Sequence, residues 1–134
     1  MSEENVEIVR SRFERFISTG ELTEEWYTDD FVWDMSTFRG WPEKQQYHGL
    51  AGVREFLSGW VEAWDDWRME LRAIYGAQDG RVVTVARQFG KSKTSGLDAT
   101  MDFAQVWTLE GGRYARMQMY ANPDEALEAA GLSE

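Results

Sequence analysis

The chain has 134 residues, of which 43% are hydrophobic and 14% aromatic, a size and composition that fit one folded domain and exclude a disordered chain. Twenty-four acidic and fourteen basic residues give a formal net charge of −10, which disfavours nucleic acid as a partner because its phosphates carry the same sign. The absence of cysteine excludes disulfides, thiolate metal ligands and a cysteine nucleophile. No apolar run approaches the roughly 18–20 residues of a membrane span, and the acidic start is unlike a signal peptide, so we expect a cytoplasmic protein without a membrane partner.

The first two predicted elements are helices. Apolar residues three and four positions apart predict an amphipathic helix over residues 3–18, which ends at Gly20. A shorter helix is predicted over residues 22–27, with Thr23 as its N-cap and two glutamates in its first turn.

A strand, a loop and a third helix follow. Asp29 and Asp30 predict a turn, after which the apolar residues of 31–35 predict a short strand. Residues 36–48 show no periodicity and predict an irregular loop that carries three aromatic residues. A third helix is predicted over residues 50–65, with its apolar side chains again three and four positions apart.

The second half of the chain changes to the two-residue alternation typical of strands. Asp79-Gly80 and the glycine pair after Glu110 are hairpin turn signals, and they separate predicted strands over 67–75, 82–89, 99–109 and 113–120. Asn122 as cap and Pro123 at the first position predict a short last helix. Helices segregated from an antiparallel sheet predict an α+β fold, formed by residues 1–134 as a single domain.

Three segments carry a resemblance to a known family. They are residues 26–33 before the first strand, residues 47–57 at the start of the third helix, and residues 103–109 followed by Gly112-Arg113 and Met119-Tyr120. With the order α-α-β-α-β-β-β-β, the chain resembles the SnoaL-like group of the nuclear transport factor 2-like superfamily. The resemblance implies a cone-shaped α+β barrel, in which three N-terminal helices pack on a curved, mostly antiparallel sheet around a deep pocket. This fold hosts isomerases, cyclases, epoxide hydrolases, dehydratases and adaptors without catalytic activity.

The catalytic positions that the resemblance implies are occupied by residues unable to do the same chemistry. Relatives similar to ketosteroid isomerase carry carboxyl groups where this chain has Met35 and Gln105. Relatives similar to limonene epoxide hydrolase carry an arginine and two aspartates at the positions of Ala86, Gln88 and Met119. Neither catalytic set is therefore present.

Strand alternation predicts which side chains face the inside of the cone. The inward set forms an apolar, aromatic-lined pocket, and its two amides can donate and accept hydrogen bonds. With residues of the loop and the third helix, the predicted ligand-binding set is Trp33, Met35, Trp41, Tyr47, Trp60, Gln88, Phe103, Gln105, Trp107, Met117 and Met119. Trp41 and Tyr47 either form a lid over this pocket or pack on the edge of the sheet.

Two side chains are candidate catalytic bases. His48, the only histidine, precedes the third helix at the implied pocket mouth, where it is either a general base or a polar contact at the start of the helix. Asp34 reaches the pocket only if a one-residue bulge turns it inward, because strand alternation points it outward. Asp65 and Asp66 lack the further ligands of a metal site, and we expect neither a metal nor a cofactor.

Three functions compete at this stage. The first is a protein that binds a small apolar or ring-containing molecule, with no reaction assigned. The second is an isomerase or polyketide-cyclase-type enzyme that uses His48 or Asp34 as base and Gln105 as oxyanion donor. The third is a non-catalytic dimeric adaptor. Relatives usually pair through the outer sheet face, and we expect a homodimer there, formed by Val83, Val85, Phe89, Val106, Tyr114 and Tyr120.

Overall fold

The computed structural model describes residues 2–132, whose strands form one six-stranded sheet in the order β2-β1-β6-β5-β4-β3. The strands are β1 (Tyr27–Asp34), β2 (Gln46–His48), β3 (Trp64–Gly76), β4 (Val82–Ser92), β5 (Asp98–Glu110) and β6 (Arg113–Tyr120). The pairing of β1 with β6 is parallel and the other pairings are antiparallel. This confirms the predicted α+β cone with a mostly antiparallel sheet.

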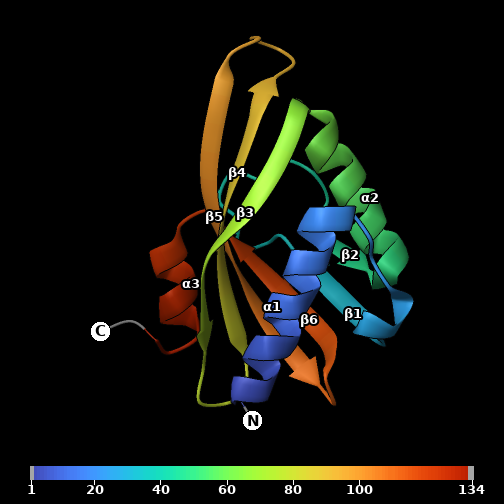
Figure 1. Ribbon diagram of the computed structural model, residues 1–134, viewed down its shortest axis with the longest axis vertical. Coiled ribbons are helices and arrows are strands. Elements are labelled where there is room, and N and C mark those ends of the chain that lie inside the picture. The colour runs from blue at the N-terminus through green and yellow to red at the C-terminus, as the bar shows by residue number, and fades with distance from the viewer. Residues whose placement is uncertain (1, 133–134) are drawn as a thin grey trace.

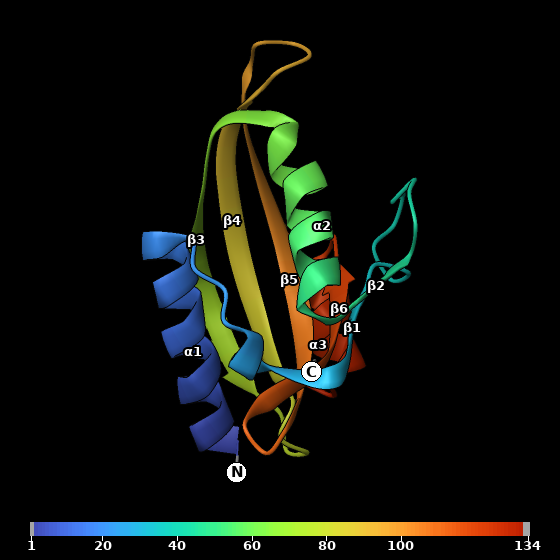
Figure 2. The same ribbon diagram turned by 90° about the vertical axis from the view of Figure 1, so that its right-hand side faces the viewer.

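The helices cover both faces of this curved sheet. Helices α1 (Ser2–Thr19) and α2 (Gly49–Glu62) lie over the concave face, and α3 (Pro123–Ala129) lies behind the opposite face (Figure 1). A short 3₁₀ helix, η1 (Glu24–Trp26), connects α1 to the first strand. The hairpin of β4 and β5 projects beyond the helices at one end of the molecule (Figure 2).

Several predicted boundaries differ from the observed ones. The second helix is reduced to η1, and Thr23 makes no side-chain cap hydrogen bond. The predicted turn at Asp29-Asp30 lies inside β1, where an irregularity in the pairing with β6 absorbs the extra residues. The predicted loop over 36–48 ends in the short strand β2, and the third helix ends at Glu62, so that Trp64 and Asp65 begin β3. Tyr27, residues 46–48 and residues 64–65 each pair with another strand, and this pairing overrides the local signal.

The alternation of inward and outward residues follows the prediction along most of the sheet. All nine sheet residues predicted to face inward are buried, and they are Trp33, Met35, Ala86, Gln88, Phe103, Gln105, Trp107, Met117 and Met119. Tyr114 is an exception, because it was predicted to face outward and lies in the concave core. A bulge causes this difference: Thr108 pairs with Arg116 but Leu109 pairs with Tyr114, which reverses the alternation before Met117.

A second, smaller core lies on the outer face of the sheet. There α3 places Ala126 and Ala130 against Val83, Val106 and Tyr120, all of which are buried. The side chain of Asn122 caps this helix by accepting a hydrogen bond from the backbone N–H of Asp124 at 2.9 Å. Much of the apolar surface on which the homodimer was predicted is therefore covered within one chain.

The edge strand β3 has an irregular start. Its register with β4 shifts between Asp65 and Arg68, and Asp66 between them has a φ of 54°, a conformation that few side chains adopt. Beyond this bulge, Arg68, Glu70 and Arg72 alternate with apolar residues. None of the helices within residues 2–132 is both long and apolar enough to cross a bilayer.

Two glycines of α2 provide a matched test of helix packing. A Cβ atom on Gly52 would lie 2.8 Å from the backbone carbonyl carbon of Tyr47, whereas one on Gly59 would meet no atom within 4 Å. Gly52→Ala should therefore lower the free energy of unfolding by about 1–3 kcal/mol, because α2 must move away from β2. Gly59→Ala should raise it by about 0.5–1 kcal/mol through its helix preference. Urea unfolding of both variants checks this, and equal effects would contradict the packing described.

Candidate functional site

A cavity of about 60 Å³ lies between α1, η1, α2 and the concave face of the sheet. Its walls are almost entirely apolar, and aromatic rings from all of these elements contribute. Six of the predicted ligand-binding residues line it, namely Trp33, Trp60, Phe103, Gln105, Trp107 and Met119. The cavity is small beside typical ligand pockets of about 300–1,000 Å³ because the aromatic side chains themselves fill most of the cone.

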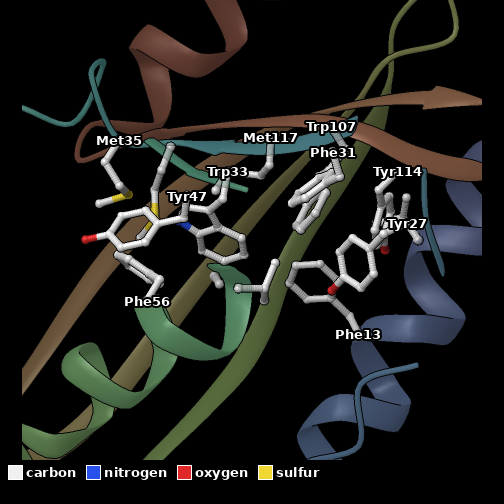
Figure 3. Close-up of a cluster of buried hydrophobic side chains, with 14 of the residues drawn as sticks. Phe13, Tyr27, Phe31, Trp33, Met35, Tyr47, Phe56, Trp107, Tyr114 and Met117 are labelled. Carbon is white, nitrogen blue, oxygen red and sulfur yellow. The ribbon is translucent and has the colours of Figure 1, made fainter. Parts of the chain in front are cut away.

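The structure places five other predicted ligand-binding residues outside the cavity wall. Met35, Tyr47, Gln88 and Met117 are buried, and Trp41 is half-buried in the loop before β2. Met35, Tyr47 and Phe56 lie on one side of the aromatic cluster, away from Phe13, Tyr27 and Tyr114 (Figure 3). Four of them belong to the hydrophobic core around the cavity or pack against it, and Gln88 bonds to Trp60 of the cavity wall.

Gln88 is fixed by two tryptophans. Its Oε1 accepts hydrogen bonds from Trp60 Nε1 at 2.6 Å and from Trp67 Nε1 at 3.0 Å. Because an indole nitrogen can only donate, the orientation of this amide is determined by its partners. Gln88 therefore joins α2 and β3 to β4 and serves the packing of the cone.

Gln105 has a different environment. Trp107 Nε1 donates to Thr84 Oγ1 at 3.0 Å, and the Thr84 hydroxyl donates to Gln105 Oε1 over a long 3.4 Å. Within residues 2–132, no hydrogen bond engages the amide nitrogen of Gln105. Since Gln105 lines the cavity, this amide is available to a bound molecule.

Trp33 carries a buried donor without a partner. Its Nε1 is enclosed and makes no hydrogen bond to any of the described residues. The ring packs on Phe56 with centroids 4.8 Å apart and meets Trp107 edge to face at 6.1 Å. In Figure 3 the nitrogen lies on the side of Tyr47 and Met35. A buried donor without an acceptor costs about 1–3 kcal/mol, and this one points toward residues that do not line the cavity.

The aromatic loop before β2 packs on α2. Trp41 lies 5.4 Å from Phe56 and 5.8 Å from Trp60 between ring centroids, and its Nε1 donates to the carbonyl of Lys44 at 3.0 Å. Tyr47 meets Phe56 edge to face at 5.5 Å. Both residues therefore pack against the core-facing rings of α2, and neither lines the cavity itself.

Asp34 lies on the outer face, as strand alternation indicates. Its carboxylate is 2% exposed and forms an ion pair with Arg116, and it accepts a hydrogen bond from the backbone N–H of Ser36 at 2.8 Å. Arg116 belongs to β6, which pairs with β1 in parallel. The carboxylate is thus committed to joining these two strands and does not line the cavity.

His48 lies at the junction of β2 and α2. Its side chain is exposed, and it forms no cap hydrogen bond to the start of the helix. It is not among the residues that line the cavity. Within residues 2–132, no three histidine, aspartate or glutamate side chains gather in the way that a bound metal ion requires.

Sequence reasoning missed the end of the cavity nearest α1. Arg12, Phe13, Tyr27 and Tyr114 line it there. The sequence pattern predicts Tyr27 at the end of a helix and Tyr114 on the outer face, so neither belongs to the predicted pocket. The two-residue alternation of Phe31 and Trp33 extends back to Tyr27 and indicates that this side chain faces inward. No feature of the sequence indicates the bulge that turns Tyr114 inward.

The comparisons with known proteins agree with this geometry. Residues 11–117 match the family model of the SnoaL-like domain, whereas no curated protein matches the chain in sequence. TerC, co-crystallised with polyporic acid, is 23% identical, with a TM-score of 0.68 and coverage of 94% of this chain and 96% of TerC.

Two further solved structures share the fold. A protein of Xanthomonas campestris pv. campestris, provisionally named a polyketide cyclase, is 18% identical with a TM-score of 0.69, covering 92% of this chain and 94% of that one. A protein of Bacillus subtilis, provisionally named an isomerase, is 17% identical with a TM-score of 0.69, covering 99% of this chain and 97% of that one. The family match spans most of the chain, and these structures reproduce its sheet and helices. The chain therefore belongs to the SnoaL-like domain family.

Proposed function

We propose that this protein binds a small apolar, ring-containing molecule in the cavity between α1, α2 and the sheet. The observation that carries the proposal is the composition of the cavity wall, which combines aromatic and apolar side chains with a few hydrogen-bonding groups. The amide nitrogen of Gln105 has no hydrogen-bond partner among the described residues, and Gln105 borders the cavity. The small free volume means that a ring must displace side chains as it enters.

The relatives favour a small molecule of this kind. TerC was co-crystallised with polyporic acid, and the Xanthomonas and Bacillus proteins carry provisional names of enzymes that act on organic molecules. An adaptor with a vestigial cavity would have no use for a polar amide in an apolar wall. The amide of Gln105 therefore favours binding over an adaptor role.

We assign no carboxylate-dependent reaction to the cavity. No aspartate, glutamate or histidine is among its lining residues within the described chain. Asp34 is paired with Arg116 on the outer face, and His48 is exposed at the sheet edge. Met119 lines the cavity at one of the positions where relatives carry an acid, and a thioether cannot accept a proton there.

The two buried glutamines should respond differently to replacement by leucine. Gln105→Leu should leave the free energy of unfolding nearly unchanged but weaken a polar ring ligand by about 1–3 kcal/mol, through loss of one hydrogen bond. Gln88→Leu should destabilise the fold by about 1–3 kcal/mol for each of the two indole donors that it leaves unpaired. Chemical unfolding and calorimetric titration measure the two effects. If Gln105→Leu unfolds the protein, its amide belongs to the packing and not to a binding site.

The reactions of the better-known relatives should be absent. We expect no turnover of a Δ5-ketosteroid or of limonene epoxide, because a missing general base alone costs about a hundred- to ten-thousandfold in rate. Apolar ring compounds should nevertheless raise the melting temperature by binding the native state. The assays include His48→Ala and Asp34→Asn as controls. Clear wild-type activity that either substitution abolishes would assign the role of base to that residue.

A homodimer through the outer sheet face remains a prediction. Helix α3 covers part of this face, and Val85 and Phe89 on the same face remain partly exposed. Arg68 lies over the Phe89 ring at 4.8 Å, and Arg87 pairs with Asp102 across β4 and β5. Sedimentation equilibrium at micromolar concentration should give twice the chain mass of 15.5 kDa. A species of 15.5 kDa would rule the dimer out.

A further inference from the structure

One charged side chain reaches the cavity, and it is a cation. Of the described lining residues, only Arg12 carries a formal charge. Its guanidinium donates to the backbone carbonyls of Gly112 at 2.7 Å and Trp26 at 3.4 Å. No carboxylate of residues 2–132 lies within 4 Å of it, although the chain has ten more acids than bases. The remaining donors of this guanidinium are available to an acceptor in the cavity.

Aromatic rings hold this cation in place. The guanidinium carbon lies 4.8 Å from the centroid of Tyr114 and 5.6 Å from that of Trp26. Tyr27 meets Tyr114 edge to face at 5.5 Å, and both gather with Phe13 at the α1 end of the aromatic cluster (Figure 3). Burial raises the pKa of both tyrosines well above their usual value, with the charge of Arg12 opposing the shift. Both phenols are therefore neutral hydrogen-bond donors near pH 7.

The polar groups of the cavity wall thus share one property. The guanidinium of Arg12, the phenols of Tyr27 and Tyr114, and the amide of Gln105 can all donate a hydrogen bond. No lining residue of the described chain is an anion that would need a donor from the ligand. A cation in a mainly apolar wall is best stabilised by an anion close to it.

We propose that Arg12, Tyr27 and Tyr114 bind an anionic oxygen of the ligand, whose ring occupies the apolar part of the cavity. The ligand class is then an apolar ring compound that bears a carboxylate or an ionised enol or phenol. This inference rests on the proposed function and adds the chemical class of ligand to it. A purely structural Arg12, which only fastens η1 and the β5–β6 turn to α1, would not distinguish anionic from neutral ligands.

Matched pairs of probes test the charge requirement directly. Calorimetric titrations at pH 7 compare benzoate with benzamide, and 2-naphthoate with 2-naphthamide, which have the same ring and nearly the same shape. Wild-type protein should bind each carboxylate about ten- to a hundredfold more tightly than its amide, as expected for charge-assisted hydrogen bonds. Arg12→Gln should bring the two affinities of each pair to within about threefold while changing the amide's affinity little.

Arg15→Gln is the control variant. Arg15 lies on the same helix as Arg12, pairs with Glu21 on the surface at 3.0 Å and does not line the cavity, so its loss should leave the preference intact. If Arg12→Gln loses the circular dichroism spectrum of the native protein, Tyr114→Phe becomes the test variant. This variant keeps the aromatic ring under the Arg12 guanidinium but removes the phenol. It should reduce the preference for carboxylate over amide about fivefold or more.

The possible failures have different meanings. Wild-type protein that binds acid and amide equally well overturns the anion site and leaves the proposed function standing. A preference that survives in Arg12→Gln, or in Tyr114→Phe where that variant replaces it, shows that these residues do not form the site. Absence of binding by all four probes overturns both the proposed function and this inference.

Discussion

Two indole N–H groups that can only donate converge on one carbonyl oxygen, that of Gln88, near the junction of α2 and β3. The donors come from α2 and β3, which join at the end of the helix, and the acceptor comes from β4. Gln88 and Trp60 are buried, so breaking the bond between them would leave both polar groups without a partner away from water, whereas Trp67 is partly exposed. This junction fixes α2 over the sheet, and the position of α2 in turn defines one wall of the cavity. The packing of Phe56 and Trp60 against the aromatic loop depends on the same position.

The sequence predicted the concave face well because side-chain alternation is a local property of a strand. Gln88, Gln105 and Met119 lie on the face assigned to them, and all three are buried. What the alternation could not predict is the bulge opposite Leu109, which depends on the pairing of two strands and brings Tyr114 inward. The short strand β2 escaped prediction for the same reason, since three residues carry little pattern of their own.

The location of the cavity was harder to predict than the face it lies on. Whether an inward side chain touches free space depends on the volumes of its neighbours, which periodicity does not report. Met35 and Gln105 face the same way, but only Gln105 borders the cavity. The arginine on α1 was likewise hidden, because between apolar helix positions a charge usually indicates a solvated face. The position of Arg12 depends on the turn after β5. The carbonyl of Gly112 in this turn accepts a hydrogen bond from the guanidinium, which lies over the ring of Tyr114.

The bulge at the start of β3 affects how the molecule behaves among its own copies. β3 is thirteen residues long and forms one end of the sheet, so its outer row of backbone N–H and C=O groups has no partner strand within the sheet. A long, flat edge of this kind is a template for adding a strand from another molecule, which leads to aggregation. The left-handed conformation of Asp66 bends this edge, and Arg68, Glu70 and Arg72 place charges along it that an incoming strand would have to desolvate. The irregularity that interrupts the ladder on the inner side thus helps to keep separate chains from joining along this edge.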